Sequence, residues 1–348
     1  MDTLIKHITN GLELDEQHVD AAVELLLDES ADVAKKVSFL EALANKGETA
    51  REIAAFVIAL LRSAVDPGVA GMKLEGPTID VCGTGGDKLD LFNVSTTSMF
   101  VIAAGGAVVT KHGNRGITSK SGGADVLEAL GIRIDLPPEG FRHCLTEAGV
   151  GFLFAPQYHP AFKAVVPVRK ILAERGKRTI FNLIGPLLNP ASPQCQLVGV
   201  MEPSLAPTFA DILQRLGREL VWSVSGSTAD GQSVDEVSLL GPTCIYKSGS
   251  IQRAVDEEIK PEAFGLKTAA LSDLQGGNAQ ENAVLLTAIL DGSDTGPKHD
   301  MILLNAGAGL ACAGLADNMG DGIEQARALI ASGKALKRLT ALQEASKA

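Results

Sequence analysis

"TIDVCGTGGDKLDLFNVSTTSMFVIAAGG", residues 78–106, passes from one structural pattern to another within one short stretch. The apolar run "TIDVC" is typical of a buried strand, and "STTSMFVIAAGG" has the length and the closing glycines of a helix. Gly83, Gly85 and Gly86 lie between them and permit tight backbone turns. A strand, a glycine-rich loop and a helix in this order predict a parallel sheet covered by helices.

The same alternation continues toward the C-terminus. The strand-like runs are "AVVT" (107–110), "GFLFA" (151–155), "QLVGV" (196–200) and "LVWSVSG" (220–226). The helical stretches between them are "GADVLEALG" (123–131), "PPEGFRHCLTEAG" (137–149) and "SLAPTFADILQRLG" (204–217). After residue 275 the pattern is helical again. We therefore predict an α/β domain with a central, largely parallel sheet flanked by helices.

The first 65 residues follow a different, helical pattern. Apolar residues recur at helical spacing around 19–27 and 53–61, and Thr49 with Glu52 resembles a capping box. The segment "DPGVAGMKLEGP", 66–77, interrupts this pattern with glycines and prolines. We predict a small N-terminal helical bundle before it, which is too small for a rich core of its own.

Charge and composition limit the classes of function. The formal net charge of −11 leaves no basic surplus for a phosphate backbone, so nucleic acid is not an expected partner. The five cysteines are widely spaced without a Cys-x-x-Cys pair, which is typical of reduced thiols. The first residues lack a signal-peptide pattern, and no apolar run reaches the length of about 18 residues that a membrane span requires. We expect a cytoplasmic protein without a membrane contact.

The glycine-rich stretch is the first candidate site. It follows a strand at the carboxyl edge of the predicted sheet, where backbone amides and the next helix N-terminus can bind an anion. Asn93, Ser95 and Thr96 add side-chain donors, and Asp87 adds a carboxylate. The stretch matches neither nucleotide-binding fingerprint, and a tight connection with a capped helix is the alternative interpretation.

Three further stretches carry chemistry. Lys111, His112, Asn114, Arg115 and Lys120 gather positive charge and polar groups after the next strand, in a pattern that suits a phosphate or a solvated loop.

The adjacent carboxylates Asp235 and Glu236 precede a strand-like run. Paired carboxylates are usually surface charges, but beside a bound pyrophosphate they are natural Mg²⁺ ligands. Arg169 lies on a helix, where an arginine is either a surface charge or a ligand contact.

In this order and spacing, the motifs closely resemble those of the anthranilate phosphoribosyltransferase family, whose fold class is that of the pyrimidine nucleoside phosphorylases. The matching motifs are "GTGGD…FNVST", "KHGNR…SGGADVLEALG", "FLFAP..HPA", "RTIFNLIGPLLNP" and "GGNAQENA". They cover essentially the whole chain. The resemblance implies transfer of a phosphoribosyl group from phosphoribosyl pyrophosphate to the amine of anthranilate, in tryptophan biosynthesis.

The resemblance also implies a role for particular residues. The expected contacts of phosphoribosyl pyrophosphate are Gly83, Gly86, Asp87, Asn93, Val94, Ser95, Thr96, Lys111, His112, Gly113, Asn114, Arg115 and Ser119. Anthranilate is expected to contact Gly83, His112, Asn114, His159 and Arg169. Mg²⁺, the expected cofactor, is assigned to Ser95, Asp235 and Glu236, and catalysis to Lys111, Arg169, Asp235 and Glu236.

The resemblance predicts the domain organisation as well. The helical domain is expected to comprise residues 1–74 and a helical return at about 168–192, and the α/β domain residues 75–348. A homodimer through the helical domain is implied. The sequence departs from the family pattern at Lys88, Leu91 and Gly123, and the last two are left out of the predicted site.

Two other functions compete with this interpretation. A pyrimidine nucleoside phosphorylase shares the architecture and a glycine-rich phosphate loop, but "KHGNR" and "RTIFNLIGPLLNP" favour the transferase. A non-catalytic homologue that binds nucleic acid would have no use for Asp235 and Glu236, and the net charge of −11 opposes it.

Overall fold

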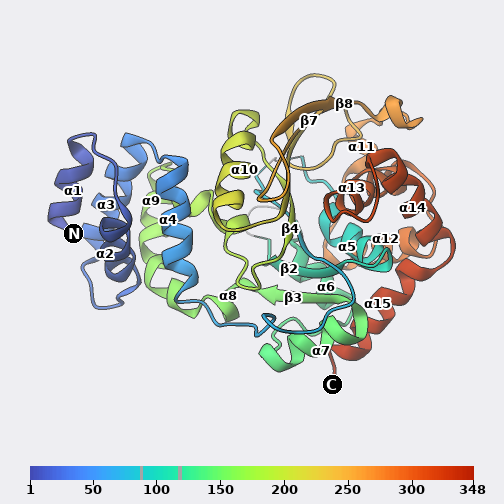
Figure 1. Ribbon diagram of the computed structural model, residues 1–348, viewed down its shortest axis with the longest axis horizontal. Helices are drawn as coiled ribbons and strands as arrows, with labels where there is room; N and C mark the ends of the chain where they lie inside the picture. The colour runs from blue at the N-terminus through green and yellow to red at the C-terminus, as the bar shows by residue number, and fades with distance from the viewer. Residues whose placement is uncertain (87–88, 117–119) are drawn as a thin grey trace. The chain divides into compact units, whose positions relative to one another are not determined.

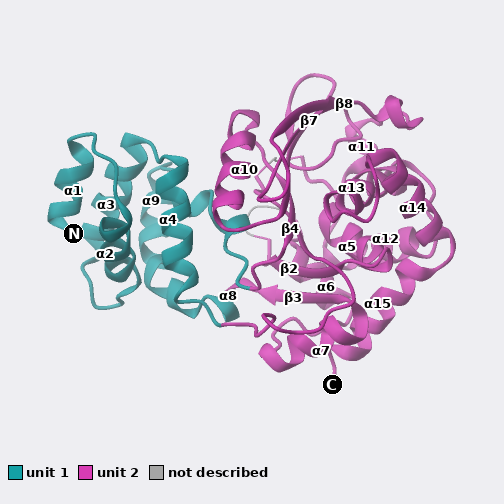
Figure 2. Cartoon of the chain, viewed as in Figure 1, with its two compact units in different colours: residues 1–65, 156–190 teal, residues 66–155, 191–348 magenta. Residues whose placement is uncertain are grey.

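The structure is a computed structural model that describes residues 1–86, 89–116 and 120–348. The chain divides into two compact units (Figure 2), one formed by Met1–Val65 with Pro156–Pro190 and the other by Asp66–Ala155 with Ala191–Ala348. These bounds differ from the predicted 1–74 and 168–192. The residues after Val65 lie in the larger unit, where the Arg142 guanidinium donates a hydrogen bond to the Pro67 carbonyl over 3.1 Å.

The smaller unit is the predicted helical bundle. Its helices are α1 (Asp2–Thr9), α2 (Glu16–Leu27), α3 (Val33–Lys46), α4 (Ala50–Leu61) and α9 (Val166–Glu174). The short helix α8 (Ala155–Tyr158) begins one residue before the second segment, which also contains the 3₁₀ turns η1 (Pro160–Val165), η2 (Ile180–Asn182) and η3 (Gly185–Leu187). Each long helix buries one apolar stripe, which for α4 includes Ile53, Phe56, Val57 and Leu60.

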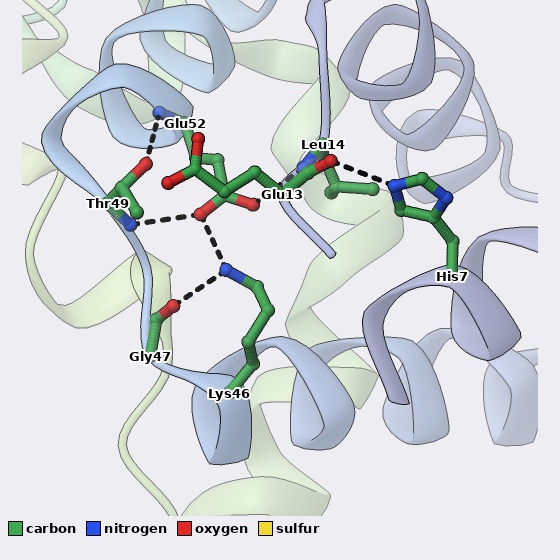
Figure 3. A network of polar contacts seen from close by, with 7 residues as sticks. All are labelled: His7, Glu13, Leu14, Lys46, Gly47, Thr49 and Glu52. Carbon is green, nitrogen blue, oxygen red and sulfur yellow. Dashed lines mark hydrogen bonds and ion pairs between the residues drawn. The ribbon is translucent and has the colours of Figure 1, made fainter. Parts of the chain in front are cut away.

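A buried carboxylate ties three parts of this unit together (Figure 3). Glu52 is fully buried, and its Oε1 accepts a hydrogen bond from the Leu14 amide over 2.9 Å. Its Oε2 accepts from Lys46 Nζ over 2.7 Å and from the Thr49 amide over 2.9 Å. The Thr49 hydroxyl accepts in return from the Glu52 amide, so the predicted capping box is confirmed. Glu52 thus caps α4 and fixes both the end of α3 and the segment before α2.

The described residues of the larger unit form one sheet of eight strands. The strands are β1 (Thr78–Gly83), β2 (Val108–Gly113), β3 (Val150–Phe154), β4 (Cys195–Gly199), β5 (Leu220–Ser227), β6 (Ser233–Val234), β7 (Thr243–Ser248) and β8 (Val255–Ile259). Their order is β3-β2-β1-β4-β5-β7-β8, with β6 paired to β5. The pairs from β3 to β5 are parallel, whereas β6, β7 and β8 add antiparallel pairs. The predicted α/β fold with a largely parallel sheet is confirmed.

The strand order contains a point where the direction of winding reverses. From β1 the chain moves outward to β2 and β3, and it then returns to place β4 on the other side of β1. Ligands of open α/β sheets bind at such a point, beyond the carboxyl ends of the two strands. Here these ends are Gly83 of β1 and Gly199 of β4, which are register partners.

Helices cover the sheet from both sides (Figure 1). The helices of this unit are α5 (Val94–Ala104), α6 (Gly123–Ala129), α7 (Pro138–Ala148), α10 (Ala206–Arg215), α11 (Leu271–Leu274), α12 (Ala279–Leu290), α13 (Pro297–Cys312), α14 (Met319–Ala331) and α15 (Lys334–Ala345). Helices α5 and α13 pack against each other and against β1 and β4, and α10 packs against β5 and β7. One apolar core joins the sheet to α5 and α13 and extends to α12, α14 and α15. No helix in the described part of the chain is long and apolar enough to cross a membrane.

Candidate active site

Asp235 lies directly over the carboxyl ends of β1 and β4. A Cβ atom on Gly199 would lie 1.7 Å from the Asp235 carbonyl oxygen, and one on Gly83 would lie 2.3 Å from Asp235 Oδ2. Any side chain larger than hydrogen at either position would displace this residue. Because both positions are glycine, the segment after β6 can reach the carboxyl ends of β1 and β4, where the fold predicts a ligand.

The Asp235 carboxylate is buried and bound to the loop after β1. Its Oδ2 accepts a hydrogen bond from the Gly85 amide over 2.6 Å. The loop itself continues the pairing of β1 with β4, because the Thr84 amide donates to the Gly199 carbonyl over 2.9 Å. We call the described residues between β1 and α5, 84–86 and 89–93, the glycine loop. In this loop Gly85 and Gly86 both have positive φ angles, of 69° and 91°.

Glu236 and Ser95 line one small cavity, together with Gly199 at the end of β4. The cavity has a volume of about 10 Å³, room for about one water molecule. Asn305 and Cys82 also line it. Burial and the neighbouring Asp80 carboxylate raise the pKa of the Cys82 thiol well above its usual range, so this thiol is neutral. The oxygen atoms of Ser95, Ser98, Glu236 and Asn305 are therefore the polar groups that can bind a cation or water there.

The segment that carries the two carboxylates is fixed by Asn305 of α13. Asn305 Oδ1 accepts from the Val237 amide over 3.0 Å, and its Nδ2 donates to the Val237 carbonyl over 2.9 Å. Its second amide hydrogen is donated to the Met301 carbonyl over 2.9 Å. Asn305 thus pairs with Val237 as a neighbouring strand would, directly after Glu236.

Lys111 brings a positive charge to the start of α5. It lies in β2 and is buried, with Nζ donating to the Val81 carbonyl over 2.5 Å and to Ser95 Oγ over 3.2 Å. Ser95 and Thr96 form the first turn of α5 with Val94, where free amide groups and the helix dipole favour an anion. The Lys111 ammonium group and the N-terminus of α5 therefore both favour the binding of an anion near Ser95.

The residues after Lys111 occupy the end of β2 and the loop that follows. His112 is buried, and its amide donates to Asp80 Oδ1 over 3.3 Å. β2 ends at Gly113. Asn114 is exposed, and its Oδ1 accepts from the Arg115 amide over 2.8 Å. We call the described residues between β2 and α6, 114–116 and 120–122, the second loop.

Arg115 is directed along the surface in this structure. Its guanidinium makes two hydrogen bonds to the Glu128 carboxylate, of 3.1 and 2.8 Å, and lies 4.7 Å from the centre of the Phe154 ring. Both members of the ion pair are about half exposed, so the pair is weak and a phosphate can compete for the arginine.

Two predicted residues lie in the helical unit. His159 is buried, its Nε2 is 2.9 Å from the Leu188 carbonyl oxygen, and burial lowers its pKa. Its ring centre is 5.2 Å from that of Phe162. The Arg169 guanidinium lies over the Phe181 ring, 6.0 Å from its centre. Asp87 and Ser119, also predicted, lie outside the described residues.

Three supporting residues were missed in the sequence. Asp125 of α6 accepts hydrogen bonds from the Gly116 and Gly122 amides, each over 2.8 Å, and so closes the second loop. Asn282 of α12 hydrogen-bonds to Asn93. Asn305 could have been found, because a lone asparagine inside the apolar run "DMILLNAGAGLACAGLA" is a polar group that must find buried partners. The partners of Asp125 and Asn282 depend on the three-dimensional fold.

The donor set of the site suits magnesium. The protein supplies the hydroxyl of Ser95 and the carboxylates of Asp235 and Glu236, all of which are oxygen donors. Among the described residues, no three His, Cys, Asp or Glu side chains gather into a cluster that could hold a metal alone. Such a partial set fits Mg²⁺, which keeps waters and takes phosphate oxygens as its other ligands.

Comparisons with known proteins agree with this geometry. Residues 2–64 match the family model for the helical bundle domain of a glycosyl transferase family, and residues 75–336 match the model for its a/b domain. The chain is 42% identical, over 97% of its length and 96% of the relative's, to anthranilate phosphoribosyltransferase of Desulfatibacillum aliphaticivorans. It is 41% identical to that of Herpetosiphon aurantiacus, over 97% of each chain.

Solved structures give the same result. The crystal structure of anthranilate phosphoribosyltransferase from Thermus thermophilus superposes with a TM-score of 0.88 at 37% identity, covering 99% of both chains. The Saccharomyces cerevisiae enzyme in complex with phosphoribosyl pyrophosphate and Mg superposes with a TM-score of 0.85 at 29% identity, covering 99% of this chain and 98% of that one. The chain therefore belongs to this glycosyl transferase family and, within it, to the anthranilate phosphoribosyltransferases.

Proposed function

We propose that this chain transfers the phosphoribosyl group of phosphoribosyl pyrophosphate to the amine of anthranilate and releases pyrophosphate. In this reaction the bond from C1 of the ribose to the pyrophosphate oxygen breaks, and a bond from the anthranilate nitrogen to C1 forms. The nitrogen loses one proton. The observation that carries the proposal is the meeting of the glycine loop, Asp235 and the start of α5 at the carboxyl ends of β1 and β4.

The site is suited to a departing anion. Bond breaking at C1 has oxocarbenium character and leaves negative charge on the pyrophosphate. Lys111, the amide groups of the glycine loop and the N-terminus of α5 are fixed groups that stabilise this charge. Ser95, Asp235 and Glu236 are the residues that would hold Mg²⁺. Bound there, Mg²⁺ would neutralise pyrophosphate oxygens as the charge develops.

For the acceptor we propose Arg169, with Gly83, His112, Asn114 and His159 as further contacts. A guanidinium binds a carboxylate through two parallel hydrogen bonds, and this geometry would orient the ring of anthranilate. An aromatic amine is already uncharged at neutral pH. We therefore assign no general base.

We also propose that the chain forms a homodimer through the helical unit. Leu12 and Val33 expose 52% and 37% of their surface there, although both are apolar. A mass in solution of twice the 36.2 kDa of the chain is expected in light scattering, and a mass of one chain would contradict the dimer.

Release of pyrophosphate tests the function against its alternatives. We expect release from phosphoribosyl pyrophosphate only when anthranilate is present, and no phosphorolysis of thymidine or uridine. Phosphorolysis of either nucleoside without transfer to anthranilate would instead indicate a pyrimidine nucleoside phosphorylase.

A further inference from the structure

Hydrogen bonds through Asn93 join three segments that are far apart in the sequence. Asn282 Nδ2, from α12, donates to Asn93 Oδ1 over 2.8 Å. Asn93 Nδ2 in turn donates to the Ser121 carbonyl over 3.1 Å. Asn93 ends the glycine loop and Ser121 belongs to the second loop. One asparagine of α12 is therefore linked to both loops of the proposed phosphate site.

Asn93 lies at the N-cap position of α5 but does not cap the helix. Asparagine is among the preferred N-cap residues because its Oδ1 accepts from the amides of the first turn. Here the Asn93 side chain makes no capping hydrogen bond, and both ends of its amide are bound to Asn282 and Ser121. The first turn of α5 is thus left to an anion rather than to its own N-cap side chain.

The orientation of Asn282 is fixed by its own surroundings. Its Oδ1 accepts from the Gly277 amide over 2.8 Å, and its Nδ2 also donates to the Gly277 carbonyl over 3.3 Å. The side chain is buried, with 4% of the residue exposed. These contacts determine which end of the amide is the donor, and the remaining Nδ2 hydrogen is directed at Asn93.

The segment before α12 supports this arrangement with backbone hydrogen bonds. The Phe92 amide donates to the Leu274 carbonyl over 3.1 Å, and the Gly276 amide donates to the Asp90 carbonyl over 2.8 Å. A Cβ atom on Gly276 would lie 2.8 Å from Phe92 Cα and 2.9 Å from Asn282 Oδ1. The end of the glycine loop is therefore packed tightly on the segment that carries Asn282.

We propose that Asn282 is a positioning residue that sets the glycine loop and the second loop for phosphoribosyl pyrophosphate, acting through Asn93. This inference rests on the proposed function. It gives a role to the motif "GGNAQENA", which the proposed reaction does not otherwise use. Asn282 makes no contact with the reacting atoms in this scheme, and its effect falls on binding of one substrate.

Steady-state kinetics of Asn282→Ala test the proposal. Loss of the hydrogen bond from Asn282 to Asn93 is expected to raise KM for phosphoribosyl pyrophosphate about tenfold. KM for anthranilate is expected to change less than about twofold. Asn278→Ala is the matched control, because Asn278 caps the same helix and contacts the Gln280 and Glu281 amides. This control is expected to lower the melting temperature and to leave both KM values unchanged.

A double variant tests whether the effect passes through Asn93. If it does, Asn93→Ala with Asn282→Ala has the same KM for phosphoribosyl pyrophosphate as Asn93→Ala alone. Independent, multiplying effects of the two substitutions contradict the proposal. An Asn282→Ala variant in which KM for phosphoribosyl pyrophosphate and KM for anthranilate rise together also contradicts the proposal. Such a joint rise is the result expected when a substitution destabilises the whole fold.

Asn282→Asp keeps the proposal testable if the alanine variant does not fold. The aspartate still accepts from the Gly277 amide but cannot donate to Asn93, so the same rise in KM for phosphoribosyl pyrophosphate is expected. A wild-type KM overturns the proposal.

Calorimetry with Mg²⁺ and pyrophosphate separates the role of Asn282 from the proposed function. A wild-type protein that binds pyrophosphate but does not use anthranilate ends the proposed function, and weaker pyrophosphate binding by Asn282→Asp still supports the role of Asn282.

Discussion

Asp235 is the residue on which the chemistry of this fold converges. It is buried, accepts a hydrogen bond from the Gly85 amide, and lies over two strands that have only glycine at their ends. An adjacent carboxylate, Glu236, lines a cavity together with Ser95. Ser95 lies in the first turn of α5 and accepts a hydrogen bond from Lys111, so Glu236 is close to a helix N-terminus that favours anions. A cation bound by the carboxylates can therefore also bind an anionic group at this N-terminus.

The two carboxylates give the first prediction. Asp235→Asn with Glu236→Gln keeps the side-chain shapes but removes both charges that would attract Mg²⁺. Turnover in the presence of Mg²⁺ is expected to be abolished, while the far-UV circular dichroism spectrum and the melting transition show a folded protein. A double variant that turns over at the wild-type rate would remove these carboxylates from the proposed metal site.

Arg169 gives the second prediction, which concerns the acceptor. Its guanidinium has a stacking partner in Phe181, and the proposal assigns it to the carboxylate of anthranilate. Hydrogen bonds to a charged group contribute about 1.5–3 kcal/mol, so Arg169→Ala is expected to raise KM for anthranilate about tenfold to a hundredfold. KM for phosphoribosyl pyrophosphate is expected to stay nearly constant. Equal changes in both constants would contradict a role specific to the acceptor.

At the scale of elements, short polar contacts decide how the helices and loops end. Thr49 and Glu52 could be predicted as a capping box because the motif lies within four residues of sequence. The other partners of Glu52, the Leu14 amide and Lys46, belong to different elements and could not be predicted in this way. Local patterns fix a cap, whereas the packing of helices decides what else the capping residue binds.

Glu52 gives the third prediction. Burial alone would raise the pKa of this carboxyl, but the hydrogen bonds from Leu14, Lys46 and Thr49 outweigh burial and lower the pKa. Its contribution to stability is therefore full above its unfolded pKa of about 4.3 and is lost as the pH falls below that value.

Removal of the Glu52 charge is expected to weaken the helical unit. Glu52→Gln should lower the free energy of unfolding by about 3 kcal/mol at neutral pH, because Lys46 and a backbone amide lose their anionic acceptor. The difference from wild type is expected to shrink below about pH 4. Urea unfolding followed by circular dichroism at several pH values measures both effects, and a difference that is constant over pH would contradict the role of the charge.

At the scale of the whole molecule, the alternation of strands and helices predicted the fold class, but the site required the order of the strands. Gly83 and Asp235 are far apart in sequence and are brought together only because β4 pairs with β1 and β6 pairs with β5. The antiparallel strands β7 and β8 were not predicted, and their places in the sheet follow from the pairing of β7 with β5 and of β8 with β7. The roles assigned to the site residues stay predictions, and Asp87 and Ser119 lie outside the described residues.

The family resemblance supplied what periodicity could not. It connected "GTGGD", "KHGNR" and the pair Asp235 and Glu236 as parts of one site, although each motif alone also fitted a loop or a surface charge. The structure adds the supports of that site. Asn282 and Asn305 come from helices near the C-terminus and fix, through hydrogen bonds, the segments that carry Asn93 and Glu236. Such long-range contacts are visible only when the chain is folded.

The most direct test of the central claim is the loss of anthranilate fluorescence in a mixture of the protein, anthranilate, phosphoribosyl pyrophosphate and Mg²⁺. We predict a steady loss that requires all components and stops when a chelator removes the metal. An unchanged fluorescence with folded protein that still binds phosphoribosyl pyrophosphate would contradict the account, because the site would then serve a different acceptor.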